Sequence, residues 1–330
     1  MNDGPRFCRM IVGVIGIAAA ICSLPAASSP AETQSKMSRV GILTAGSGSL
    51  EALRQSLRDL GWVEGRNVTL EVRDTEGKPE RAHDLALQLA RLKVDVIVAT
   101  HPAAVFSAKR ATATIPIVMV HTPDPVQLGL VTSLAHPGGN ITGTTTLSLE
   151  LSIKQLEILK EGVPRASRIA VLSNPDNPWH PLVVKGLRTE PRWPGVQLQI
   201  LEVRRPNEFD RAFQAMMRER ADAVLVLADP MTFTHRSRLT DLAAKHRLPL
   251  MSGPRGYTEA GGLMSYWADE LELSRRAASY VDKILKGTKP ESLPIEQPTQ
   301  YELVINLKTA KVLALAIPPS LLLRATVIDP

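Results

Sequence analysis

The chain has 330 residues, of which 44% are hydrophobic and 22% charged, which is the composition of a globular protein and excludes an intrinsically disordered one. This length exceeds one small domain and suits two domains of ordinary size. The net charge of +6 is spread along the chain without a basic run, so it describes a solvated surface and argues against nucleic-acid binding.

Residues 1–31 have the order of a secretory signal peptide. Two arginines precede an apolar run from Met10 to Ser23, and small residues follow through Ala31. The apolar run is too short for a comfortable transmembrane span. We therefore expect these residues to be a cleaved signal peptide and the mature protein to be periplasmic.

Both cysteines, Cys8 and Cys22, lie in this leader. A lipoprotein anchor at Cys22 is the weaker alternative, because Ile21 stands where a small residue is wanted. The mature chain would then hold no cysteine, which excludes disulfides, cysteine nucleophiles and thiolate metal sites.

From residue 40 onward, short apolar strands alternate with amphipathic helices. The predicted strands are 40–43, 68–72, 94–99 and 117–120, and the predicted helices are 50–60, 82–92, 103–113 and 126–134. This βαβ order implies parallel strands with right-handed connections.

The same pattern returns about 130 residues later. Three strands recur in the same order: Val40–Thr44 as Ile169–Ser173, Val94–Ala99 as Ala221–Ala228, and Ile115–Val118 as Leu248–Met251. The repetition predicts two similar lobes, although any doubly wound sheet contains such strands. Under both interpretations the fold class is α/β, with two doubly wound parallel-sheet lobes joined by a hinge.

The remaining segments of the second lobe and the crossings follow from the same patterns. Further elements are expected as helices at 153–159, 209–216, 239–242 and 273–284, and as strands at 196–203, 263–266, 303–305 and 325–328, with Asn306 as a helix N-cap. The strand-forming stretches 141–146 and 263–266 are interpreted as crossings, and the proline-rich segment 289–300 as an extended connection. We expect the first lobe to be 37–143 plus about 264–298, and the second 144–263 plus about 299–330.

Ligands of open parallel sheets bind beyond the carboxyl ends of the strands. The residues that follow the predicted strands are small polar groups with two carboxylates: Thr44, Gly46, Ser47, Ser49, Thr100, His101, Thr122, Asp124, Asn174 and Asp229. Such a set suits a small zwitterion or polar organic molecule. The alternative is that these residues are helix caps and turn formers.

Aromatic residues also follow predicted strands, and their rings could line an apolar or aromatic ligand pocket or merely cover the sheet ends. They are Trp179, Phe233, Tyr257, Tyr266 and Trp267, of which Tyr257 and Tyr266 are the ligand-binding candidates. His101 and His121 follow adjacent strands, and a metal or acid–base role for this pair is a minor alternative. Nucleotide-binding and hydrolase motifs are absent, since the glycines at 46 and 48 lack the third member of the dinucleotide fingerprint.

The carboxylate of Asp229 ends the second copy of the central strand. A buried carboxylate there should either cap a helix or meet a cation. In a cleft for a zwitterion, Asp229 would hold the ligand's ammonium group, while residues 44–49 and the adjacent helix N-terminus would take its carboxylate.

Three segments carry a resemblance to a known family: LGWVEGRNV at 60–68, DPVQLGLV at 124–131 and GNITG at 139–143. In this order, the chain resembles over residues 37–330 the exported substrate-binding proteins of ABC importers, in the branch with tryptophan-binding components. The resemblance implies a type I periplasmic binding fold with about three crossings between its lobes.

The same resemblance implies capture of a small organic solute, either amino acid-like or an aromatic or apolar carboxylate, and its delivery to a membrane permease. It implies a monomer that is not an enzyme and has no cofactor and no metal. One departure is Asp229-Pro230, where relatives often have Asp-Asn, so the ligand's identity is not carried over. A ligand sensor that regulates a partner and a two-lobed α/β enzyme are the alternatives.

Overall fold

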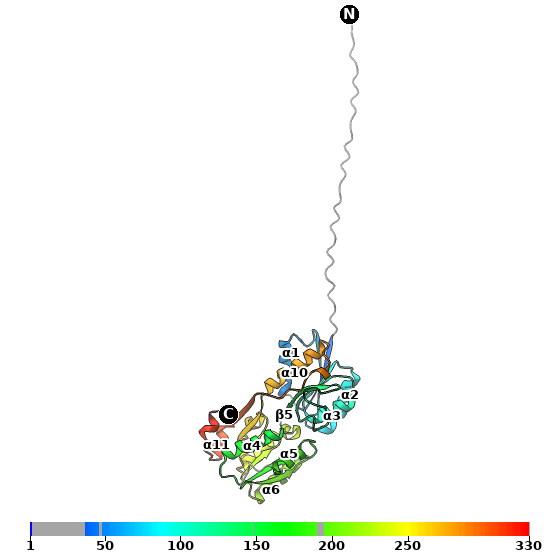
Figure 1. Cartoon of the computed structure of the whole chain (residues 1–330). Coiled ribbons are helices and arrows are strands. Elements are labelled where there is room, and N and C mark those ends of the chain that lie inside the picture. Colours follow the sequence, from blue (N-terminus) through cyan, green and yellow to red (C-terminus); the bar gives the residue numbers. More distant parts are fainter. Residues whose placement is uncertain (2–36, 46–47, 147, 190–194, 330) are drawn as a thin grey trace. The chain divides into compact units, whose positions relative to one another are not determined.

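The computed structural model describes residue 1 and residues 37–45, 48–146, 148–189 and 195–329. The predicted signal peptide, apart from Met1, lies outside these residues. Within Lys36–Pro330 the chain forms two α/β lobes, each built on its own sheet (Figure 1). In the part that is described, no helix has the length and apolar character needed to cross a membrane.

The first lobe contains a five-stranded sheet in which every neighbouring pair is parallel, in the order β2-β1-β3-β4-β5. Its strands are β1 (Ser38–Thr44), β2 (Val68–Asp74), β3 (Val96–Ala99), β4 (Ile117–Pro123) and β5 (Ile141–Thr146). All four residues of β3 are fully buried, as expected for a short apolar strand that is covered on both faces.

The second lobe contains a seven-stranded sheet in the order β12-β11-β10-β9-β8-β6-β7. Its strands are β6 (Arg168–Ser173), β7 (Gln197–Glu202), β8 (Ala223–Val226), β9 (Leu250–Ser252), β10 (Met264–Ala268), β11 (Tyr301–Asn306) and β12 (Thr326–Ile328). The part β7-β6-β8-β9-β10 is parallel and has the order of the first sheet, so the predicted repetition is confirmed. Strand β11 pairs antiparallel with β10, so it runs opposite to the five parallel strands.

Helices cover both faces of the first sheet. One face carries α1 (Gly48–Asp59) and α10 (Glu270–Leu285), whose apolar residues join the core formed by Val40, Val96 and Val118. The other face carries α2 (Ala82–Arg91) and α3 (Pro102–Ala111). These helices are the predicted ones, because leucines and alanines recur on each at helical spacing.

The second sheet is covered in the same way. One face carries α4 (Ser148–Gly162), α5 (His180–Thr189), α11 (Leu307–Val312) and α12 (Pro319–Leu322). The other carries α6 (Phe209–Arg218), α7 (Pro230–Thr234), α8 (Arg236–Lys245) and α9 (Gly256–Glu259). Short 3-10 turns occur at Pro79–Arg81, Pro206–Glu208 and Pro290–Ser292.

Several helical segments differ from the sequence expectation, and among them the short helices α7, α9 and α12 were not predicted. The predicted helix at 126–134 is wrong, because Gly129 has a left-handed φ of +66° and the amides of Leu130 and Val131 both turn back to the carbonyl of Pro125. Helix α5 was not predicted. Its buried Val183 and Leu187 lie four residues apart on one face.

The chain crosses between the lobes after β5, between β10 and α10, and again before β11. Strand β10 pairs with β9 and β11, so it belongs to the second sheet. The structure therefore differs from the expected boundary near residue 264, since the chain returns to the first lobe with α10 rather than with the strand. Beyond α10, Ile295 and Glu296 donate backbone bonds to Leu134 and Gly143 of the first lobe.

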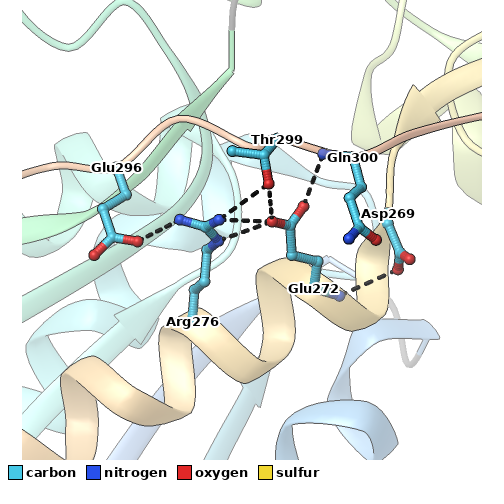
Figure 2. A network of polar contacts seen from close by, with 6 residues as sticks. All are labelled: Asp269, Glu272, Arg276, Glu296, Thr299 and Gln300. Atoms are coloured by element: carbon cyan, nitrogen blue, oxygen red, sulfur yellow. Dashed lines mark hydrogen bonds and ion pairs between the residues drawn. The ribbon is translucent and has the colours of Figure 1, made fainter.

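A polar network binds the second and third crossings to one another (Figure 2). The backbone N–H of Asp269 donates to the carbonyl of Gln300 at 3.1 Å, and the Asp269 side chain caps α10 by accepting from Leu271 N and Glu272 N. The carboxylate of Glu272 accepts from the Thr299 hydroxyl at 2.7 Å and from Gln300 N at 3.2 Å.

Arg276 completes this network from the next turn of α10. Its guanidinium donates to Glu272 at 2.6 Å and also pairs with Glu296 (Figure 2). Burial alone would raise the pKa of Glu272, but the bonds from Thr299, Arg276 and Gln300 outweigh burial and hold that pKa below its usual value. Glu272 is therefore a fixed anion where the lobes are connected.

Candidate functional site

A cavity of about 170 Å³ lies between the two lobes, at the carboxyl ends of their strands. The first lobe contributes the ends of β1 and β4 and the turn from β3 into α3. The second lobe contributes α4, α5, the turn from β8 into α7, and the ends of β9 and β10. This is the location predicted from the sheet topology.

His101 lies at the turn from β3 into α3 and is only 6% exposed. Its Nδ1 accepts from Ala104 N at 3.3 Å and caps the helix, so the proton of the neutral ring is on Nε2. Burial lowers the pKa of His101 to about 4, although the charge of Asp229 opposes this shift. At neutral pH His101 is therefore a neutral donor, and its buried Nε2 has no partner among the described residues.

Trp179 provides a second unpaired donor on the opposite lobe. It precedes α5, it is 6% exposed, it lines the cavity, and it also belongs to the hydrophobic core of the second lobe. Its backbone N–H donates to Asn177 Oδ1 at 3.2 Å, which fixes the start of the helix. The buried Nε1 has no partner in the described part of the chain. Each lobe thus contributes to the wall of the same cavity one residue that holds an unpaired neutral N–H donor.

His180 connects two of the loops that form the second-lobe wall. Its Nδ1 accepts from Asn174 N at 2.9 Å, so Nε2 carries the proton and donates to the carbonyl of Ala228 at 3.1 Å. Burial lowers the pKa of His180, while Asp229 and the two backbone bonds oppose that effect. The neutral ring of His180 therefore links the loop after β6 to the loop after β8 by hydrogen bonds.

The Asp229 side chain is a helix cap. Its Oδ1 accepts from Met231 N at 3.0 Å and from Thr232 N at 3.4 Å. The amides of Asn174 and Asn177 also donate to this carboxylate, at 3.1 to 3.3 Å. Of the two roles expected from the sequence, the cap is observed, and the ammonium-binding role stays a prediction. Asp229 also lines the cavity, and among the described residues its Oδ2 accepts from the two side-chain amides.

A second, smaller cavity of about 20 Å³ adjoins this carboxylate. It is lined on the first lobe by Thr75 and His101, and on the second by Asn174, Asn177 and Asp229. The buried hydroxyl of Thr75 has no partner among the described residues. The volume suits one water-sized polar group.

Several predicted site residues lie at these cavities. Thr44, Thr100, His101 and Asp229 line the larger cavity, and Asn174 lines the smaller one. The hydroxyl of Thr100 donates to that of Thr44 at 3.2 Å, which connects the ends of two neighbouring strands. The sheet topology brings these five together.

Other predicted residues lie elsewhere. Thr122 is fully buried in β4 and lines neither cavity, although its hydroxyl has no partner in the described part of the chain. Asp124 is exposed and holds a turn by accepting from Gln127 N at 3.0 Å. Gly46, Ser47 and the side chains of Ser49 and His121 lie outside the described part of the chain.

The aromatic candidates divide by the direction of their rings. Tyr257 is fully buried in the second-lobe core, where its hydroxyl donates to Thr232 at 2.8 Å, so its ring is not at the cavity. Tyr266 stacks on Tyr301, with ring centroids 5.7 Å apart, and does not line the cavity. The rings that line the cavity belong to Trp179, Phe233 and Trp267.

Sequence reasoning missed the contribution of α4 and α5. Ser152 and Gln155 on α4 and His180 on α5 line the cavity. The buried pair Val183 and Leu187 would have indicated α5 and placed His180 at its start. No pattern in the sequence distinguishes the cavity-facing side of α4, because that helix is buried on several sides.

The walls suggest what the cavity can hold. In the described lining there is no lysine or arginine, and the apolar part consists of alanines, prolines, a leucine, a valine and the three aromatic residues. Among the described residues, no three His, Cys, Asp or Glu side chains are grouped closely enough to hold a metal ion. The arrangement is that of a small-molecule pocket with a few neutral donors and one carboxylate.

Comparisons with known proteins find relatives of this chain. A tyrosine-binding protein of Clostridioides difficile is 25% identical over 260 residues, which cover 78% of this chain and 74% of that protein. The structure of a conserved domain protein from Vibrio cholerae is 28% identical, with a TM-score of 0.83 over 89% of this chain and 100% of the other. A domain from Streptococcus pneumonia in complex with L-Trp is 24% identical, with a TM-score of 0.81 over 88% and 99% of the two chains.

Similarity extends to type I periplasmic binding folds with other solutes, such as a myo-inositol complex from Bacillus halodurans, which has a TM-score of 0.58 at 13% identity over 86% of this chain and 99% of the other. At that identity only the fold is shared. The family model for ABC transporter substrate binding proteins matches residues 44–328, which span both lobes and all three crossings. The chain therefore belongs to the ABC transporter substrate-binding protein family.

Proposed function

We propose that this protein is the exported solute-binding component of an ABC importer, which captures an aromatic amino acid-like solute or an aromatic carboxylate between its lobes. Membership of a solute-binding family supports the binding role, and the named tyrosine and tryptophan ligands of two relatives support the solute class. The observation that carries the proposal is that two residues lining the aromatic-walled interlobe cavity, His101 and Trp179, each hold a buried neutral donor without a partner among the described residues, Nε2 and Nε1.

The unpaired donors favour a solute that brings hydrogen-bond acceptors. A buried donor without a partner costs about 1–3 kcal/mol, so an acceptor that reaches either atom recovers that energy. Because His101 and Trp179 are on different lobes, one solute that pairs with both also stabilises the lobes against each other. The solute's ring would pack against Phe233 and Trp267.

The ammonium group of such a solute would pair with Asp229, because Asp176, the other carboxylate that lines the small cavity, is already paired with Arg204 at 3.5 Å. Asp229 is a carboxylate in a cavity wall whose described part has no lysine or arginine, and the adjoining small cavity has room for one polar group. An ammonium there would donate to Asp229 Oδ2 and to the hydroxyl of Thr75. The solute's carboxylate would then lie nearer His101, Thr44 and Thr100.

Export and delivery follow from the same proposal. Family members work outside the cytoplasmic membrane, and the leader at 1–31 would bring this chain there as a periplasmic monomer that docks on a permease. N-terminal sequencing of protein from the periplasm should give a start between Ser28 and Glu32. Recovery of intact Met1 in the cytoplasm would contradict export.

Isothermal titration calorimetry of the purified protein tests the binding role. L-Tyrosine and L-tryptophan are compared with tyramine, which lacks the carboxylate, and with 3-(4-hydroxyphenyl)propionate, which lacks the ammonium. We expect saturable one-to-one binding of at least one amino acid and weaker binding of both analogues. The variant Trp179→Phe, which keeps a ring but loses Nε1–H, should bind about two- to tenfold more weakly.

Two outcomes would favour the alternatives. Chemical conversion of a bound compound would indicate a two-lobed enzyme. Binding that changes association with a regulatory partner and not with a permease would indicate a ligand sensor. If none of the compounds binds and mass spectrometry of freshly purified protein finds no retained small molecule, the proposed solute class is wrong.

A further inference from the structure

A third cavity, of about 210 Å³, is lined mainly by the second lobe and also by Asp269 and Leu271 at the start of α10. It is lined by residues at the ends of β9 and β10 and by Arg255, Ser265 and Glu302. In the described part of the chain, Trp267 is the one residue that lines both this cavity and the interlobe cavity. Trp267 therefore lies where the two spaces adjoin.

The position of this ring depends on Gly253. A Cβ atom built on Gly253 would lie 2.4 Å from Cε3 and 2.8 Å from Cζ3 of Trp267, so the indole rests on the glycine backbone. Gly253 lines the third cavity and not the interlobe cavity. A side chain at 253 would therefore displace the ring from the third cavity toward the solute. Trp267 also packs against the first-lobe core, which fixes it from the other lobe.

The third cavity is chemically unlike the first. Arg255 donates to Glu259 at 2.8 Å and to Glu302 at 2.9 Å in its wall. The hydroxyl of Ser265 is buried, and in the described part of the chain it has no partner. The space behind Trp267 thus has a charged pair and an unpaired hydroxyl beside the apolar side chains of Leu271 and Val304, whereas the described wall of the interlobe cavity has no lysine or arginine.

We propose that Trp267 is a specificity-determining residue that sets the length of solute the site accepts, by closing the interlobe cavity off from the third cavity. The proposal rests on the proposed function only in that the interlobe cavity holds the solute. Removing the indole joins the two cavities and lets a longer solute reach Ser265. Adding a methyl group at Gly253 shortens the space available.

Two substitutions of opposite effect test this. The probes are L-phenylalanine and 4-phenyl-L-phenylalanine, which share a head group and differ by one ring. Trp267→Ala should bind the longer probe roughly ten- to a hundredfold more tightly than the wild type does, because a second ring becomes buried. Gly253→Ala should bind L-phenylalanine roughly tenfold more weakly than the wild type. The backbone of Gly253 is not left-handed, so alanine is tolerated there apart from the contact with the ring.

Trp62→Ala is the matched control. It removes a tryptophan that lines neither cavity and whose Nε1 donates to Asp282 at 3.0 Å, so the ratio of affinities for the two probes should match the wild type. A Trp267→Ala protein with the wild-type ratio, or a Gly253→Ala protein with wild-type affinity, would overturn the proposal. Trp267→Leu replaces the alanine variant if that protein does not fold.

Ligand-free crystal structures of the wild type and Trp267→Ala separate this inference from the proposed function. A continuous space from Phe233 to Ser265 in the variant is the expected result. Collapse of neighbouring side chains into the gap would overturn the proposal. If the spaces join but neither protein binds any aromatic amino acid, the solute class is wrong and the role of Trp267 as a boundary stands.

Discussion

Asp229 is the most heavily bonded acceptor in the cavity wall, and replacing it by alanine should cost stability. The change removes the N-cap of α7, which is worth about 1 kcal/mol. It also leaves the buried amide of Asn174 and the partly buried amide of Asn177 without this acceptor, at about 1 kcal/mol or more each. The free energy of unfolding should therefore fall by about 2–5 kcal/mol, and Tm by roughly 5–15 °C.

Thermal unfolding followed by circular dichroism measures this loss, and Asp229→Asn is the control. Asparagine keeps an oxygen that can cap Met231 and Thr232, so its Tm should lie between those of the wild type and the alanine variant. A wild-type Tm for Asp229→Ala would refute the capping argument. Calorimetry well below the Tm then isolates the ligand role, since unchanged affinity for the bound amino acid in the alanine variant would exclude an ammonium contact.

Three further predictions concern single residues. His101 has a pKa of about 4 when folded against 6.5 when unfolded, so the unfolded chain binds the proton first and stability is lost as pH falls from 6.5 to 4, by roughly 3 kcal/mol. His101→Asn keeps a capping acceptor, and its Tm should change less between pH 6.5 and 4 than the Tm of the wild type does. Equal slopes of Tm against pH for the two proteins would contradict this. Gly143→Ala should prevent folding or lower the free energy of unfolding by more than about 3 kcal/mol, because the φ of Gly143 is +127° and a Cβ there would lie 2.2 Å from Met119 O. Gly65→Ala is the control: a Cβ at Gly65 has no neighbour within 4 Å, so urea unfolding should show a loss of only about 1 kcal/mol. Glu272→Ala removes the acceptor shared by the crossings and should lower the free energy of unfolding by about 1–3 kcal/mol, and an unchanged urea midpoint would show that the network in Figure 2 contributes nothing.

The sheets could be predicted because their signals are local. An apolar run such as Val96–Ala99 is stable only as an inner strand of a sheet that is covered on both faces. Its second copy at Ala223–Val226 occupies the matching position in the other sheet. The position of the cavity followed from the same topology, because parallel strands present their carboxyl ends together. Asp229 and His101 were found by that rule alone.

The direction of side chains could not be predicted in the same way. Tyr266 and Trp267 are neighbours on β10 and point to opposite faces of the sheet. A shift of the strand's pairing register by one residue would therefore exchange the ring that lines the cavity. Tyr257 follows a strand as Trp179 does, but it lies on a short helix that turns its ring into the core. These outcomes depend on packing between segments far apart in the sequence.

The boundary at β10 shows a similar limit. The strand is short and is followed by a helix of the first lobe, so its local sequence does not tell which sheet it joins. Pairing with β9 and β11 decides it. Strand β11 comes more than thirty residues later in the chain.

The central claim is that the interlobe cavity binds a small solute whose acceptors pair with donors on both lobes. A crystal structure of the protein with L-tyrosine, L-tryptophan or a solute retained from expression tests it most directly. We predict that acceptor atoms of the solute lie within about 3.2 Å of His101 Nε2 and of Trp179 Nε1, and that the ring of the solute packs against Trp267. A solute bound outside this cavity, or one inside it that leaves both N–H groups without an acceptor, would contradict the account.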